Sequence, residues 1–140
     1  MARKRGYIMD RRSFIKSILS LLFFIFFLPL EKGIERYEKV LLLDTVVAGI
    51  RYYDAERIWN SLYIGEPLLL KREPHNPYDE KAIEVYRGNN KLGYIPRQDN
   101  GVISQVLDRN ERLYANISWL KKDPDPWNRI GIKVWTEIKA

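Results

Sequence analysis

The sequence predicts a mainly β fold: a small, closed or partly open barrel of five to six strands with one or two short helices, preceded by an N-terminal apolar helix. From residue 40 onward, short β-branched or alternating runs recur between turn residues. Only one segment there has clear helical spacing, whereas a parallel sheet would need a helix after nearly every strand. The chain has 140 residues, which is room for one domain once the N-terminal segment is set aside.

The N-terminal segment, residues 1–30, has the pattern of a targeting signal. Its basic start is followed at residues 17–30 by the uncharged run SILSLLFFIFFLPL, the arrangement of a secretory signal. As a helix this run spans about 21 Å, which is short of the roughly 30 Å hydrocarbon core of a membrane. Arg11 and Arg12, followed by Phe14 and Lys16, resemble a twin-arginine export signal.

No small-x-small cleavage site follows the apolar run, because residues 28–30 are Leu-Pro-Leu. Residues 17–30 are therefore also a candidate membrane anchor, if the segment stays uncleaved. Positive charge before the run would keep the N-terminus inside and put the domain outside the cytoplasm. We expect an exported or membrane-anchored protein, with residues 31–39 as a charged linker and residues 40–140 as the folded domain.

Six runs are expected to form the strands of that domain. The last is the clearest, because Ile130, Ile132 and Val134 alternate with polar or small residues. The stretch Gly88-Asn89-Asn90 favours a tight reversal between the third and fourth runs, since glycine and asparagine tolerate positive φ. The predicted strands are residues 40–50, 68–72, 81–87, 92–95, 113–120 and 130–138.

One helix is predicted between the fourth and fifth strands. Pro96 ends the preceding strand, and Asp99 or Asn100 is a suitable N-cap. Apolar residues then follow at helical spacing until Asn110, a plausible C-terminal stop. A second, shorter helix is possible at residues 54–63.

Charge and composition exclude several classes of function. Residues 1–16 hold six bases and one acid, which leaves 18 bases and 17 acids in the rest of the chain, so the domain is nearly neutral. A nucleic-acid site would therefore depend on a local patch of basic residues. The chain has no cysteine, which excludes disulfides, thiolate zinc sites and cysteine nucleophiles. It has only one histidine, His75. We expect no catalytic residues, no metal and no small-molecule cofactor.

Several motifs lie in a characteristic order and spacing. Asn76-Pro77-Tyr78-Asp79 is followed by Ala82-Ile83-Glu84-Val85, a short turn and Leu92-Gly93-Tyr94-Ile95-Pro96. The stretch Gly49-Ile50-Arg51-Tyr52-Tyr53 precedes them. Over roughly residues 46–108 this pattern resembles the HIRAN domain, here as a small stand-alone module of the bacterial type. Asn76 to Asp79 also reads as an ordinary turn, so structure alone is an alternative explanation for that motif.

The resemblance implies an OB-like or SH3-like barrel and a binding role. HIRAN domains are best known as modules of DNA-remodelling ATPases that grip the 3′-hydroxyl end of single-stranded DNA. If this role carries over, Tyr52 and Tyr78 stack on bases, and Asp79 accepts a hydrogen bond from the terminal hydroxyl. Arg51 and Arg97 then hold phosphates, and Asn76 donates from its amide.

The sequence departs from the family pattern at three places. Tyr94 stands where the family has a histidine, and His75 stands where it has an asparagine. Either Trp119 or Trp127 completes the pocket as the C-terminal aromatic residue. With these positions, the predicted nucleic-acid-binding residues are Arg51, Tyr52, His75, Asn76, Tyr78, Asp79, Tyr94 and Arg97.

The predicted function is therefore a nucleic-acid-binding module whose partner is a single-stranded DNA end. The chain has no G-x-x-x-x-G-K-[ST] phosphate loop and no cysteine-rich zinc ring, so the sequence supports no helicase or hydrolase activity. The alternative is an envelope-located interaction domain that uses the same groove for a partner other than nucleic acid, also without catalysis.

Overall fold

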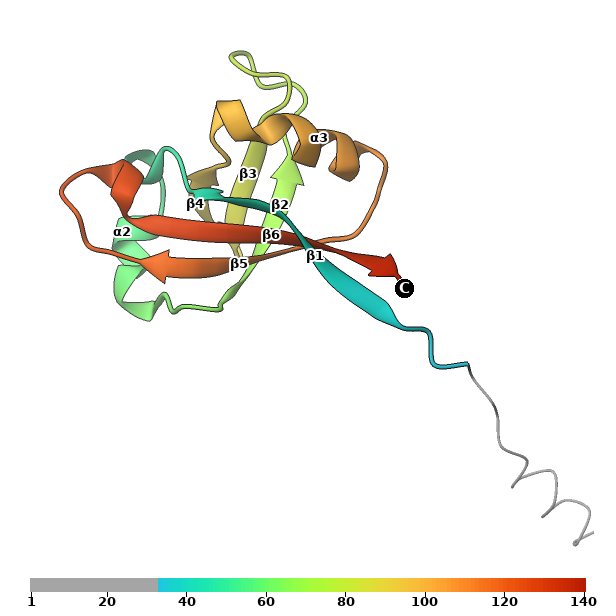
Figure 1. Cartoon of the computed structure of the whole chain (residues 1–140). Coiled ribbons are helices and arrows are strands. Elements are labelled where there is room, and N and C mark those ends of the chain that lie inside the picture. The colour runs from blue at the N-terminus through green and yellow to red at the C-terminus, as the bar shows by residue number, and fades with distance from the viewer. Residues whose placement is uncertain (1–32) are drawn as a thin grey trace, which may run out of the picture. The chain divides into compact units, whose positions relative to one another are not determined.

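The computed structural model describes residues 33–140, and their strands form one antiparallel sheet in the order β1-β6-β5-β2-β3-β4 (Figure 1). Each neighbouring pair in this order is antiparallel, so the predicted mainly β class is confirmed. The strands are β1 (Tyr37–Val46), β2 (Pro67–Arg72), β3 (Ile83–Arg87), β4 (Asn90–Tyr94), β5 (Leu113–Leu120) and β6 (Ile130–Lys139).

The two outer strands of the sheet, β1 and β4, meet just beyond the end of β1. The backbone N–H of Ala48 donates to the carbonyl oxygen of Tyr94 at 2.8 Å, and the N–H of Tyr94 donates back at 2.9 Å. Gly93 makes this approach possible, because a Cβ at that position would overlap the carbonyl oxygen of Ala48. The sheet is thereby closed into a small barrel.

The core of the barrel is built from strand residues of period two. On β6, Ile130, Ile132 and Val134 are fully buried, as their alternation predicts. Gly131 lies between them, where it leaves room for the indole ring of Trp119. The same core includes Val47, Ile50, Ile83, Val85, Leu92, Ile95, Ile103 and Ile117.

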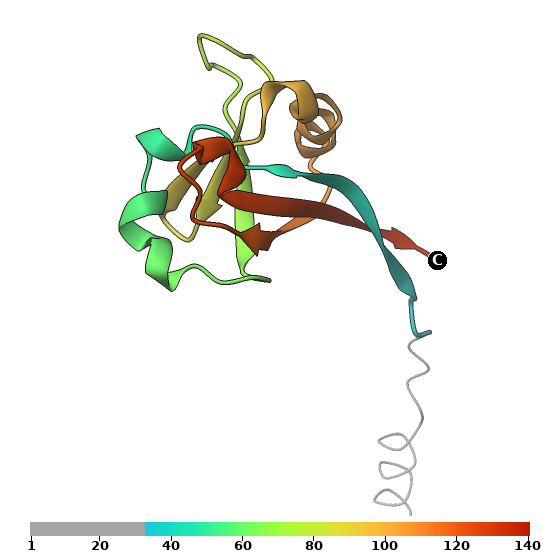
Figure 2. The same ribbon diagram turned by 60° about the vertical axis from the view of Figure 1, so that its left-hand side comes forward.

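Two α-helices and four 3-10 turns complete the domain. Helix α3 (Asn100–Asp108) lies across one end of the barrel, beside the loop between β2 and β3 (Figure 2). It buries Ile103 in the core and ends before Asn110, which has a left-handed φ of 56° as expected for a helix stop. Helix α2 is Ala55–Ile58, and the 3-10 turns are η1 (Ile50–Tyr52), η2 (Trp59–Ser61), η3 (Arg97–Asp99) and η4 (Pro126–Asn128).

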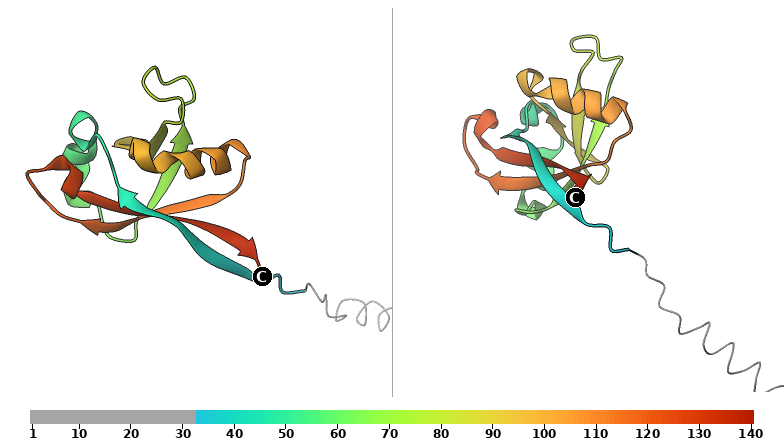
Figure 3. Two further views of the ribbon diagram at one scale, coloured as in Figure 1. Left: turned by 45° about the horizontal axis from the view of Figure 1, so that its top comes forward. Right: turned by 45° about the vertical axis from the view of Figure 1, so that its right-hand side comes forward.

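Two predicted boundaries around β1 were wrong. The predicted strand over residues 40–50 ends at Val46, because Gly49 has a φ of 75° and starts η1. Residues 37–39 belong to β1 instead of the linker, since Tyr37 to Lys39 pair with the end of β6. In Figure 3, β1 and β6 run side by side as a twisted ribbon away from the barrel.

Other predicted elements moved by smaller amounts. Strand β3 begins at Ile83 instead of residue 81, and β4 already begins at Asn90, within the predicted turn. The predicted helix at residues 54–63 is one turn of α-helix followed by η2.

Glu35–Ala140 forms a compact unit that contains every residue of the core, so this part has its own hydrophobic interior. The predicted signal or anchor at residues 1–30 lies outside the described residues. Within residues 33–140, none of the helices has the length and apolar character that a membrane crossing requires.

Candidate nucleic-acid interface

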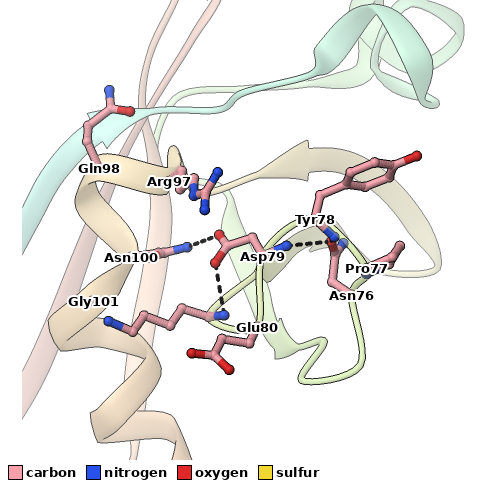
Figure 4. A pocket seen from close by; sticks show the side chains of 10 residues that line it. Asn76, Pro77, Tyr78, Asp79, Glu80, Arg97, Gln98, Asn100 and Gly101 are labelled. Atoms are coloured by element: carbon pink, nitrogen blue, oxygen red, sulfur yellow. Dashed lines mark hydrogen bonds between the residues drawn. The ribbon is translucent and has the colours of Figure 1, made fainter.

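The loop between β2 and β3 is shaped by Asn76. Its Oδ1 accepts hydrogen bonds from the backbone N–H groups of Tyr78 at 2.9 Å and Asp79 at 3.0 Å, an Asx turn (Figure 4). Its Nδ2 donates to Oε2 of Glu73 at 3.1 Å. Because Asn76 uses both ends of its amide, it fixes the direction of Tyr78 and Asp79 in the loop.

Asp79 joins this loop to the start of α3. Its Oδ2 accepts from Nδ2 of Asn100 at 2.7 Å, and its Oδ1 accepts from the backbone N–H of Lys81 at 3.0 Å. Asn100 is only 2% exposed, so it is a rigid anchor for the carboxylate. Figure 4 shows Asp79 beside Asn100, with Arg97 from the turn before α3 close by.

A second cluster gathers around Tyr94 on β4. Its hydroxyl donates to Oε2 of Glu73 at 2.6 Å and accepts from Nζ of Lys91 at 2.8 Å. The Lys91 ammonium lies 4.3 Å from the ring centroid of Tyr53 and 4.1 Å from that of Tyr94. The two rings meet edge to face, with centroids 5.8 Å apart. The lysine therefore holds both tyrosines through cation–π contacts.

The protonation states in this cluster follow from its contacts. Burial, and then the hydrogen bond to Glu73, raise the pKa of Tyr94 above its ordinary value. The hydrogen bond from Tyr94, followed by that from Asn76, lowers the pKa of Glu73. At neutral pH, Tyr94 is a neutral donor and Glu73 is an anion.

This shift predicts that stability depends on pH through Glu73. A carboxyl group whose pKa is lowered on folding stabilises the folded state above its unfolded pKa, and the stabilisation disappears as the pH falls through the folded pKa. We expect the wild type to have a larger free energy of unfolding than Glu73→Gln at neutral pH. This difference should shrink as the pH falls below 4.5, the ordinary value for the group. Urea denaturation of both proteins across this range measures it, and a difference independent of pH would contradict the assignment.

Three adjoining hollows line this side of the domain, and together we call them the groove. The central hollow, of about 530 Å³, is lined by the Asn76 loop, Tyr53, Tyr94, Arg97 and Trp127, among others. The helix hollow, of about 620 Å³, shares the loop and Arg97 and continues to the start of α3. The outer hollow, of about 330 Å³, shares Trp127 and is completed by Gly49, Arg51, Tyr52, Asp125 and Pro126.

The structure brings most of the predicted site residues to this groove. Arg51 and Tyr52 line the outer hollow. His75 lines none of the three hollows and is exposed on the loop, so the structure does not bring it to the others. The central hollow is lined by the other predicted residues, Asn76, Tyr78, Asp79, Tyr94 and Arg97.

The two candidate C-terminal aromatic residues, Trp119 and Trp127, have different surroundings in the structure. Trp119 packs against Gly131, whereas Trp127 is half exposed and lines both the central and the outer hollow. Asp125 holds the turn that carries Trp127, because its Oδ1 accepts from the Trp127 backbone N–H at 3.1 Å. The sequence signal for this turn is Asp-Pro-Trp, in which proline starts a short helix after an aspartate cap.

Among the residues that sequence reasoning missed, Tyr53 and Glu73 line the central hollow. Lys91, which was also missed, lines none of the three hollows but contacts the rings of Tyr53 and Tyr94. Tyr53 adjoins a predicted residue and Glu73 lies three residues before Asn76, so proximity was a weak signal for both. Lys91 gave no such signal, since its role depends on two rings from separate segments. In the described part of the chain, no three His, Cys, Asp or Glu side chains gather as a metal site would require.

Comparison with known families identifies the fold. The HIRAN domain family model matches residues 40–139, which is most of the chain. The chain belongs to the HIRAN domain family. The HIRAN pattern therefore extends past residue 108, where the sequence resemblance fades, and includes Trp127 and β6.

Two solved structures share this HIRAN fold. The crystal structure of a protein from Lactobacillus plantarum has a TM-score of 0.62 at 31% identity, covering 73% of this chain and 98% of that chain. The crystal structure of the HIRAN domain of human HLTF has a TM-score of 0.53 at 25% identity, covering 71% of this chain and 78% of that chain. Both support the barrel described above.

Curated relatives of this HIRAN chain are much longer proteins. The "Helicase-like transcription factor" of Mus musculus is 38% identical over 63 residues, which are 44% of this chain and 6% of that protein. A "Fanconi-associated nuclease 1 homolog" of Oryza sativa subsp. japonica is 36% identical over 74 residues, 50% of this chain and 7% of that protein. This chain thus spans less than a tenth of either relative.

Proposed function

We propose that this HIRAN domain binds single-stranded nucleic acid in the groove and holds a 3′-hydroxyl end in the central hollow. The observation that carries the proposal is a row of exposed aromatic rings along one groove. Tyr52 is 78% exposed, Tyr78 is 85% exposed and Trp127 is 50% exposed. Exposed aromatic faces stack on bases of any sequence, and each stacked base contributes about 1 to 3 kcal/mol.

Two arginines beside these rings provide the positive charge for the backbone. Arg51 lines the outer hollow, and Arg97 lines the central and helix hollows. Neither forms a side-chain hydrogen bond or ion pair with another residue of the described range 33–140, and both are exposed. A guanidinium without an internal partner is available for a phosphate group. Two such arginines are consistent with a binding site that contacts only a few phosphates of the nucleic-acid strand.

Asp79 supplies the group that distinguishes the end of a strand. Its carboxylate is held from one side by Asn100 and the Lys81 backbone, yet each oxygen keeps a lone pair for another donor. A terminal hydroxyl donates to this carboxylate, whereas a terminal phosphate is repelled by its negative charge. The fixed position of Asp79 therefore supports recognition of a hydroxyl end.

The names of the relatives agree with a nucleic-acid partner, since one is helicase-like and the other is a nuclease. Because the similarity covers only 6% and 7% of those proteins, the proposal concerns binding alone. It assigns no helicase or nuclease activity to this chain.

Salt dependence tests the proposal. We expect residues 35–140 to bind a short labelled single strand more tightly than a blunt duplex of the same sequence, measured by fluorescence anisotropy. The association constant should fall with salt, and Arg97→Gln should reduce the slope of log K against log salt by about 0.7, the value for one lost contact to a single strand.

The matched control is Arg109→Gln, which removes the same charge from an exposed position that lines none of the three hollows. Its slope should stay nearer to that of the wild type. Equal slopes for the two variants, or tighter binding to the duplex, would contradict the proposed site.

A further inference from the structure

The two carboxylate oxygens of Glu73 differ in their hydrogen bonding: Oε2 accepts hydrogen bonds within the domain, and Oε1 does not. Oε2 accepts two hydrogen bonds, from the Tyr94 hydroxyl at 2.6 Å and from Nδ2 of Asn76 at 3.1 Å. No hydrogen bond from any residue in the described part of the chain reaches Oε1. The side chain lines the central hollow together with both of its partners. Oε1 is thus an acceptor on the wall of the hollow that the fold itself does not use.

The neighbours of Glu73 fix its orientation. The Tyr94 hydroxyl donates to Glu73 and accepts from Lys91 at 2.8 Å, so it has a defined direction. Asn76 is fixed in turn by the two backbone N–H groups that its Oδ1 accepts. Two donors therefore hold Oε2 in place and leave Oε1 as the acceptor that a ligand meets.

We infer that Glu73 is a specificity-determining residue, which selects a terminal nucleotide carrying a neutral hydrogen-bond donor opposite Oε1. This inference rests on the proposed function, and it adds a second acceptor to the one supplied by Asp79. A carboxylate favours a neutral donor and repels phosphate. In a nucleotide, such a donor is either an N–H group of the base, in an exocyclic amine or in the ring as in N3–H of uracil, or a ribose 2′-hydroxyl.

The variant Glu73→Gln separates these two sources. Because two donors surround the Oε2 position, the amide oxygen of glutamine must take that position and its NH₂ group must take the position of Oε1. The substitution therefore converts the open acceptor into a donor while the internal hydrogen bonds remain. An N–H group of the base then faces the glutamine NH₂ group, and two donors cannot form a hydrogen bond. A 2′-hydroxyl can still accept a hydrogen bond from this NH₂ group through its oxygen lone pair.

Three single strands that differ only in the 3′-terminal nucleotide provide the test. A strand ending in deoxyuridine is the reference. One ending in deoxycytidine replaces the O4 carbonyl by an amine and the N3–H donor by an acceptor nitrogen, and one ending in uridine adds a 2′-hydroxyl. Affinities are measured by fluorescence anisotropy with the full chain and with residues 35–140, for the wild type, Glu73→Gln and Glu111→Gln. Glu111 is exposed and lines none of the three hollows, so its variant is a matched charge control.

For the wild type we expect the strands to differ in affinity by about tenfold, the effect of one charged hydrogen bond. Deoxycytidine binds more tightly than deoxyuridine if the base amine is the donor, and less tightly if the ring N–H is the donor. Uridine binds more tightly than deoxyuridine if the 2′-hydroxyl is the donor. If the base amine is the donor, Glu73→Gln reverses the preference in favour of deoxyuridine. If the 2′-hydroxyl is the donor, the preference for uridine weakens without reversing. Glu111→Gln keeps the preference of the wild type.

Two results would overturn the inference, and they differ in what they mean for the proposed function. If the wild type binds all three strands equally, or if Glu73→Gln keeps the wild-type ratios, Glu73 does not select the terminal nucleotide, while end binding stands. If no strand binds to the wild type, the proposed function fails together with the inference.

Discussion

Replacing Gly93 by alanine is expected to lower the free energy of unfolding by about 3 kcal/mol or more, the largest stability effect predicted for this domain. A Cβ at this position would overlap the carbonyl oxygen of Ala48 and lie 2.7 Å from Cγ1 of Val47. Ala48 forms the backbone bridge to Tyr94 that joins β1 to β4. The methyl group therefore has no space unless this closure of the barrel opens.

Urea denaturation monitored by tryptophan fluorescence measures the effect. Gly101→Ala is the matched control, because a Cβ at Gly101 meets nothing within 4 Å and the residue lies in helix α3. Alanine is a better helix former than glycine, so this variant should be as stable as the wild type or slightly more stable. A loss below about 1 kcal/mol in Gly93→Ala would show that the bridge between β1 and β4 yields easily.

The largest effect on binding is expected from removing the two most exposed aromatic rings of the central hollow, Tyr78 and Trp127, together. Tyr78→Ala and Trp127→Ala should each weaken binding to a single strand by about tenfold to a hundredfold, since each removes one stacking surface. Neither side chain belongs to the core, so the free energy of unfolding should change by no more than about 0.5 kcal/mol. The double variant should lose measurable binding.

Tyr63→Ala is the control for these two variants. Tyr63 is 56% exposed and lines none of the three hollows of the groove, so its removal should leave the affinity unchanged. Fluorescence anisotropy and thermal unfolding of the wild type and the four variants separate loss of binding from loss of folding. Wild-type affinity in the double variant would exclude the central hollow as the binding surface.

Local patterns predicted the strands well. Alternation along residues 130–138 identified β6, and the buried Ile130, Ile132 and Val134 follow it directly. The turn at residues 76–79 was also visible, because Pro77 presets the backbone and Asp79 can bond to a nearby amide, as it does to that of Lys81. The further cap by the Asn76 side chain on Tyr78 and Asp79 was not predicted. These features depend on neighbours in sequence, so sequence alone was sufficient for them.

Contacts between distant residues were beyond local patterns. The continuation of residues 40–50 as one strand failed at Gly49, where the barrel needs a left-handed residue before Ile50 turns inward. Residues 37–39 looked like a linker because their pairing partner, the end of β6, lies about a hundred residues away. Periodicity within one segment carries no information on either feature.

The candidate site was predicted in part for the same reason. Motif residues such as Tyr78 and Asp79 were identified from their resemblance to the HIRAN pattern, and they line the groove. Glu73 acquires its role only through Tyr94 on β4, which lies 21 residues further along the chain. Lys91 lies on the same strand as Tyr94, and its role depends on Tyr53 from a separate segment. His75 was chosen by its place beside the motif, yet its side chain lines none of the hollows.

The most direct test of end recognition compares two strands that are identical except at the 3′ end, one with a hydroxyl and the other with a phosphate. Fluorescence anisotropy of residues 35–140 should give at least about tenfold tighter binding to the hydroxyl end. Asp79→Asn should reduce this preference to about twofold, while Glu111→Gln, at an exposed position outside the three hollows, should retain it. Equal affinity of the wild type for both ends would contradict recognition of a 3′-hydroxyl by Asp79.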